Sequence, residues 1–138
     1  MTSLPKLFFA TGAFFALCGM AWGIQMSASQ DHTLSPAHGH LNLIGFVAMS
    51  VFGTYYALTP RAAMTRLAVV HYALVVAAVV VLVPGIVLAI TEQGAALAKA
   101  GSVLAVLAMA LFGFTVLRYG VGEARRAETP IAHAHPAQ

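Results

Sequence analysis

The sequence predicts an all-α, polytopic membrane protein with four transmembrane helices in an up-down bundle. Three observations predict this fold. First, 60% of the 138 residues are hydrophobic and only 8% are charged, whereas soluble domains usually carry about 25% charged residues. Second, the apolar residues form four runs of about 20 residues or more, each long enough to cross a hydrocarbon core roughly 30 Å thick. Third, these runs lack the polar stripe that each helix of a soluble four-helix bundle needs.

Short polar or proline-containing connections separate the four expected spans. Pro36 suits a helix start because its missing N–H would be unpaired there anyway, and Pro60 ends the second span because proline disfavours a helical residue before it. In the first span, Gly19 and Gly23 form a small-residue pair that would let another helix approach closely. We expect spans at about 7–28, 37–58, 67–90 and 97–119 within one transmembrane domain, 1–119, and a flexible cytoplasmic tail at 120–138.

The basic residues outside the spans predict the orientation of the chain, because cytoplasmic loops carry an excess of Lys and Arg. Only Lys99 falls on the opposite side of a four-span topology, beside Asp31 and Glu92. We therefore expect an integral protein of the inner (cytoplasmic) membrane, with both termini in the cytoplasm. The basic residues on the expected cytoplasmic side are Lys6, Arg61, Arg66, Arg118, Arg125 and Arg126.

Polar residues gather where the second span begins, on the expected outer side. A histidine at membrane depth costs free energy unless it is paired or ligates a metal, so His40 is a candidate ligand there, and Asn42 is a further polar group close by. His38 lies two residues earlier, and on a regular helix the two imidazoles would point about 200° apart. His38 and His40 therefore converge on one metal only if the helix begins between them. His32, in the preceding loop, is close enough along the chain to fold back.

Met26 and His71 are candidate ligands on similar grounds. Met26 ends the first span at the depth of His40, and a methionine sulfur is a known axial haem ligand; the alternative is a methionine that fills a packing gap. His71 stands near the cytoplasmic end of the third span, on the order of 20 Å from His40. A metal-binding role of His71 would be a separate one, and the alternative is pairing with a backbone carbonyl or a hydroxyl on a neighbouring helix.

The second span resembles the second transmembrane helix of the haem-copper oxidase subunit I superfamily, most closely its nitric oxide reductase and cbb3-type branch. The resemblance rests on His40-Leu41-Asn42-Leu43-Ile44-Gly45 at the start and on Phe52-Gly53-Thr54-Tyr55-Tyr56 with Thr59-Pro60 at the exit. In that family the histidine that opens this helix is an axial ligand of the low-spin haem b near the outer surface. The resemblance therefore implies that His40 ligates haem b, with Asn42 and Met26 as further candidate haem-site residues.

The resemblance covers less than half of the chain and does not reach the later helices that carry the copper and active-site haem ligands in the family. We therefore do not expect this chain alone to reduce oxygen or nitric oxide. A second axial ligand is also missing, and two subunits that each offer His40 to one haem at a two-fold interface would supply it. Glycines on the second span would allow that approach, so we expect a homo-oligomer; they are Gly39, Gly45 and Gly53.

The expected function is haem b binding in the lipid bilayer, for electron transfer or for haem or gas sensing. One alternative is an outer-face copper or zinc site built from His32, His38 and His40, because imidazole suits both metals. Another is a cofactor-free accessory subunit of a larger respiratory or photosynthetic complex, whose histidines form hydrogen bonds. The net charge of +3 is small and does not favour a nucleic-acid partner. The spans contain no paired carboxylates, and the sequence has no glycine-rich nucleotide loop, so those enzyme classes have no support.

Overall fold

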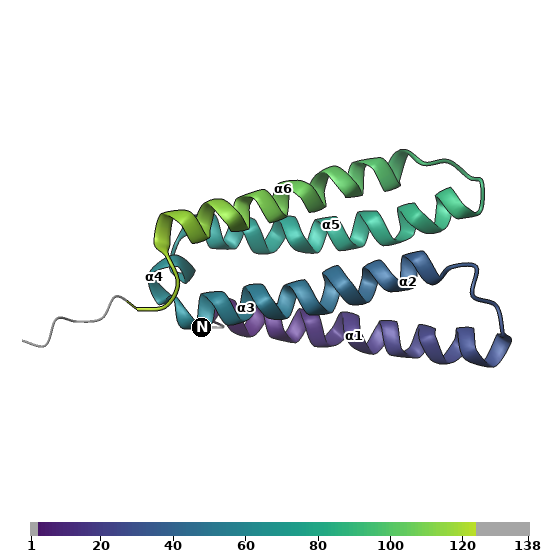
Figure 1. Cartoon of the computed structure of the whole chain (residues 1–138), viewed down its shortest axis with the longest axis horizontal. Helices are drawn as coiled ribbons and strands as arrows, with labels where there is room; N and C mark the ends of the chain where they lie inside the picture. The colour runs from purple at the N-terminus through teal and green to yellow at the C-terminus, as the bar shows by residue number, and fades with distance from the viewer. Residues whose placement is uncertain (1–2, 124–138) are drawn as a thin grey trace, which may run out of the picture.

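Four long helices run antiparallel to their neighbours in residues 3–123, the part of the chain that the computed structural model describes (Figure 1). The first is α1, Leu4–Ser29. The second span, Ser35–Leu58, is divided into α2 (Ser35–Asn42), a π-helical segment η1 (Leu43–Ala48) and α3 (Met49–Leu58). After the short α4 (Pro60–Ala63) come α5 (Arg66–Ile90) and α6 (Ala96–Tyr119). The prediction of an all-α, four-helix bundle is confirmed, and each span begins and ends within three residues of the expected position.

The outside of the bundle is apolar enough to face lipid. All four long helices have the length and composition to cross a membrane, and their exposed side chains include large apolar ones such as Phe14, Ile24 and Leu117. Soluble monomers rarely expose continuous apolar surfaces of this kind. The chain therefore has the architecture of an integral membrane protein in a lipid bilayer.

The two ends of the bundle differ in charge. At the basic end, where α1 begins and α6 ends (Figure 1), lie Lys6, Arg61, Arg66 and Arg118. At the opposite end, which we call the histidine end, the loops between α1 and α2 and between α5 and α6 carry His32, Asp31 and Glu92. Arg125 and Arg126 were expected to add to the charge of the basic end. They lie outside the described residues, as does most of the tail.

The α5–α6 hairpin is held by close backbone contact at two glycines. A methyl group added to Gly101 would lie 2.6 Å from the backbone nitrogen of Leu82, and one added to Gly85 would lie 2.6 Å from the carbonyl carbon of Leu97. Real side chains do not tolerate such distances, so both positions require glycine for the helices to touch. Close approach at small residues is a common means of helix association in membranes.

The α1 helix crosses the second span at the π-helical segment. A side chain at Gly45 would meet Phe15 at 3.0 Å, and one at Gly12 would lie 3.6 Å from the Gly45 carbonyl oxygen. Gly45 was expected to admit a second subunit, but the structure covers it with Phe15 of α1, and it covers Gly53 with Phe8 and Phe9; of the three glycines only Gly39 is open. The wider π turn was not predicted from the sequence; such segments occur mostly as single turns inside α-helices, frequently at functional sites.

Hydrogen bonds tie the end of α6 to the end of α3 at the basic end. The Tyr55 hydroxyl donates to the Gly120 carbonyl at 2.9 Å, and the Gly122 N–H donates to the Thr59 hydroxyl at 3.0 Å. Thr59 itself is fully buried. The first residues of the segment 120–138, expected as a flexible tail, are therefore bound to the bundle.

We predict that Gly101→Ala destabilises the bundle, because the added methyl would have to displace the backbone of α5 at Leu82. Overpacking of this kind costs typically about 1–3 kcal/mol. The matched control is Gly113→Ala on the same helix, where an added methyl meets nothing within 4 Å and helix propensity favours alanine by up to about 1 kcal/mol. Thermal unfolding in detergent, followed by circular dichroism, should show a lower midpoint for Gly101→Ala alone; equal midpoints would contradict the backbone contact.

Candidate functional sites at the two ends of the bundle

His40 lies on the outside of the bundle, two turns into the second span. Helix α2 begins at Ser35, with Pro36 in its first turn, as the sequence predicted. One turn later the His40 side chain is exposed, and its Nδ1 lies 2.7 Å from the Pro36 carbonyl oxygen. Because a carbonyl only accepts, Nδ1 carries the proton, and Nε2 keeps a free lone pair. Metal-ligating histidines usually have their other ring N–H held by a carbonyl or carboxylate in the same way.

The surface beside His40 is open and apolar. Leu43, Phe46 and Val47 follow His40 at helical spacing, and all three side chains are exposed. Gly39 has open space over its Cα, since an added methyl group would meet nothing within 4 Å. Together these residues, which we call the His40 face, leave a free nitrogen next to exposed apolar side chains.

His38 points to the opposite side, against α1. Its ring lies 6.2 Å from that of Trp22, edge to face, and its Cε1 approaches within 3.3 Å of a methyl position on Gly23. Since the helix begins at Ser35 and not between the two histidines, His38 and His40 diverge as a regular helix requires.

Asn42 also lies between α1 and α2. Its side-chain amide donates to the His38 carbonyl at 2.9 Å and occupies the space over Gly19, where a methyl would come within 2.6 Å of Nδ2. Gly19 and Gly23 therefore let α1 and α2 approach closely, as predicted. The side chains of α2 that pack against them are the polar ones of Asn42 and His38. Asn42 packs helices together and does not face the same space as His40.

The other candidates at this end do not join His40. Met26 is only 6% exposed and packs inside the bundle, and His32 is exposed in the loop. No three His, Cys, Asp or Glu side chains within residues 3–123 are grouped to hold a metal ion. The site built from His32, His38 and His40 therefore does not assemble in this structure.

Asp31 shapes the loop that carries His32. Its carboxylate accepts a hydrogen bond from the Thr33 N–H at 2.9 Å. Hydrogen bonds from the Thr33 side chain and backbone hold the pKa of the Asp31 carboxyl below its ordinary value. The loop at the histidine end thus carries a charged, exposed carboxylate.

His71 is the most deeply buried polar side chain of the third span, with 0% exposed. Its Nδ1 lies 3.0 Å from the Tyr56 hydroxyl on α3, which confirms the alternative of pairing with a hydroxyl on a neighbouring helix. Its Nε2 has no hydrogen-bond partner among residues 3–123, although the backbone of Ala108 on α6 lies close enough to act on the ring. A buried polar atom without a partner is uncommon in folded proteins.

Aromatic rings from three helices surround His71. The imidazole stacks on Phe112 with ring centroids 5.8 Å apart and an interplanar angle of 19°, and meets Phe52 edge to face at 4.7 Å. Phe8 and Tyr56 each lie 5.8 Å away. This cluster could not be predicted from the sequence, because its members come from α1, α3, α5 and α6 and share no motif.

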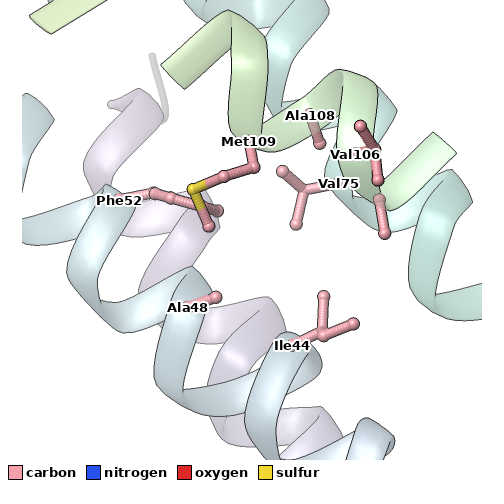
Figure 2. A pocket seen from close by; sticks show the side chains of 8 residues that line it. Ile44, Ala48, Phe52, Val75, Val106, Ala108 and Met109 are labelled. Carbon is pink, nitrogen blue, oxygen red and sulfur yellow. The ribbon is translucent and has the colours of Figure 1, made fainter. Parts of the chain in front are cut away.

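An apolar pocket of about 250 Å³ lies next to this cluster, between the second span and the α5–α6 hairpin (Figure 2). Phe52 and Ala108 belong both to its wall and to the surroundings of His71. Val106 and Met109 are 68% and 55% exposed, so the pocket opens to the outside of the bundle. Its lining residues are Ile44, Ala48, Phe52, Val75, Ala105, Val106, Ala108 and Met109.

No protein-family model, curated protein or solved structure matches this chain. The evidence for each site is therefore its own geometry, and the geometries of the two sites differ. His40 offers a free nitrogen to the outside, and His71 holds an unpartnered nitrogen inside, beside an apolar pocket.

We predict that Tyr56→Phe destabilises the protein, because it leaves Nδ1 of the buried His71 without its partner. A buried polar group left unsatisfied costs about 1–3 kcal/mol. The control is Tyr119→Phe, since the Tyr119 hydroxyl receives only a long, exposed contact of 3.4 Å from Arg118. Unfolding midpoints in detergent should fall for Tyr56→Phe and stay within error for Tyr119→Phe, and a fall of equal size in both would contradict the assignment.

Proposed function

We propose that the chain is a membrane protein that binds haem b through His40, for electron transfer or for haem or gas sensing. The observation that carries this proposal is the free Nε2 of His40 on an open apolar face. A haem site needs a ligand nitrogen of fixed orientation beside a surface that accepts a flat, apolar macrocycle. His40 and the His40 face supply both, and the resemblance of the second span to haem-ligating helices agrees with the same residue.

Each residue of the His40 face has a definite part in this proposal. Nε2 of His40 would ligate the iron, and the Pro36 carbonyl would hold Nδ1–H, which fixes the ring and raises the basicity of the ligand. Leu43, Phe46 and Val47 would cover one face of the porphyrin with hydrocarbon, while Gly39 leaves it room. The bound haem supplies the redox or gas-binding chemistry; the chain sets ligation and burial.

The second axial ligand would come from a second copy of the chain. Within residues 3–123, His38 faces α1 and Met26 is buried, so neither shares the space in front of His40. A two-fold interface along the His40 face would place one His40 from each copy on opposite sides of a single haem. This arrangement gives one haem for two chains.

The membrane orientation belongs to the same proposal. With the basic end in the cytoplasm, as positively charged loops favour, the protein sits in the inner (cytoplasmic) membrane and His40 lies near the outer surface. The haem would then exchange electrons or detect gas at that surface.

We predict that the detergent-purified protein, reduced with dithionite, shows a strong Soret peak with sharp α and β bands at one haem per two chains. His40→Ala should abolish the spectrum, because it removes both axial ligands of the shared haem. His38→Ala is the matched control, since His38 lies on the other side of the same helix, and it should leave the bands in place.

Three results would contradict the proposal: no visible bands in folded protein, bands that survive His40→Ala, or bands lost equally with His38→Ala. Metal analysis of a colourless sample would then separate the remaining alternatives. Stoichiometric copper or zinc would indicate a metal site, and co-purification of metal-free protein with a larger complex would indicate an accessory subunit.

A further inference from the structure

We propose that His71 and the adjacent apolar pocket form a second binding site, for a membrane-soluble molecule whose flat ring carries a carbonyl oxygen. An isoprenoid quinone has this chemistry. The proposal does not depend on haem binding at His40, because the two histidines lie near opposite ends of the bundle and share no contact residue.

The first support is the unpartnered nitrogen of His71. The Tyr56 hydroxyl lies 3.0 Å from Nδ1, and we assign it as the donor. In that tautomer Nε2 carries the proton, and it has no acceptor of its own among the described residues. The backbone of Ala108 is within hydrogen-bonding reach of the ring, although it makes no bond of normal geometry to Nε2, so a ligand oxygen would replace this weak contact. Leaving a buried donor unsatisfied costs free energy, and a ligand oxygen would recover it.

The second support is the position of the pocket relative to the imidazole. Ala108 on α6, whose backbone lies beside the His71 ring, lines the pocket. Val75, one helical turn from His71 on α5, also lines it. Phe52 lies in the pocket wall (Figure 2) with its ring 4.7 Å from the imidazole. His71 itself does not line the pocket, but it shares Phe52 and Ala108 with the pocket wall; the proposal therefore requires the Phe52 side chain to move aside when the ligand binds.

The size and lining of the pocket select the ligand. A cavity of about 250 Å³ is smaller than the roughly 300–1,000 Å³ of sites for drug-sized molecules, so it suits one ring whose tail remains in the bilayer. The ring of Phe52 in the pocket wall favours a flat partner. Water is a poor occupant, because a buried water needs two to four polar partners and this pocket is lined by apolar side chains.

A plain acyl chain would also fill an apolar pocket, so the test must isolate the carbonyl. We would titrate the detergent-purified full chain with decyl-benzoquinone and, separately, with decylbenzene, which has the same tail on a flat six-membered ring but no carbonyl. Calorimetry should show saturable binding of one quinone per chain, and His71→Phe should weaken it at least tenfold. Decylbenzene should bind weakly and equally to both proteins.

Two substitutions on α6 locate the site. Ala105→Phe fills the pocket at a wall residue outside the aromatic cluster around His71, and it should abolish quinone binding. Ala110→Phe makes the same change on the same helix at an exposed position outside the pocket, and it should leave binding unchanged. His40→Ala should also bind quinone normally, which separates failure of this proposal from failure of haem binding.

A direct readout covers the case in which His71→Phe does not fold. In the wild-type protein with ¹⁵N-labelled histidine, the Nε2 resonance of His71 should shift on addition of decyl-benzoquinone and not of decylbenzene. The proposal is overturned by an unchanged resonance, by absent saturable binding, by full binding in a folded His71→Phe, or by full binding in Ala105→Phe.

Discussion

The structure depends on one constraint: in a lipid environment each polar group must find its partner within the protein. Most of the described polar side chains in the spans obey it locally. Thr54, Ser102 and Thr115 each donate to the carbonyl one turn earlier on their own helix, and such local bonds require nothing of the fold. The side chains that reach another helix are therefore the ones that fix how the helices are arranged.

Those interhelical bonds concentrate toward the basic end. Tyr72 bonds to Thr11 across α5 and α1 at 2.7 Å, Tyr56 joins α3 to His71 on α5, and Tyr55 joins α3 to the end of α6. Together they connect both hairpins, which are packed internally by glycines. Tyrosine suits this task because its ring adds apolar contact area and its hydroxyl needs a partner when buried. Among residues 3–123 the side-chain hydrogen bonds of the histidine end are local. Of its polar side chains, His32 and His40 are exposed, whereas His38 and Asn42 lie against α1.

The sequence predicted the parts that depend on composition and local order. Hydropathy located the four spans, and Pro36 indicated the helix start from which the divergence of His38 and His40 follows. The sequence alone left the divergence of the two imidazoles conditional, because a helix that began between His38 and His40 would have let them converge. The π turn at Leu43–Ala48, the contacts of Gly85 and Gly101 and the rings around His71 were not predictable, since each arises from residues far apart in the chain. The pairing of His71 with a hydroxyl was one of two alternatives, and only the packing of α3 against α5 identified Tyr56 as the partner.

The same imidazole chemistry leads to opposite consequences at His40 and His71. In both residues Nδ1 is engaged: by the Pro36 carbonyl of the same helix in His40, and by the Tyr56 hydroxyl of another helix in His71. A carbonyl acceptor leaves Nε2 as a lone pair, which suits a metal, whereas a hydroxyl donor leaves Nε2 as an N–H, which suits a ligand oxygen. Because the helix of His40 supplies its partner, the His40 face depends on α2 and η1 and not on α5 or α6. The His71 site needs α3, α5 and α6 in place, so a change such as Gly101→Ala that separates α5 from α6 should weaken the proposed quinone binding in calorimetry and leave the proposed haem spectrum unchanged.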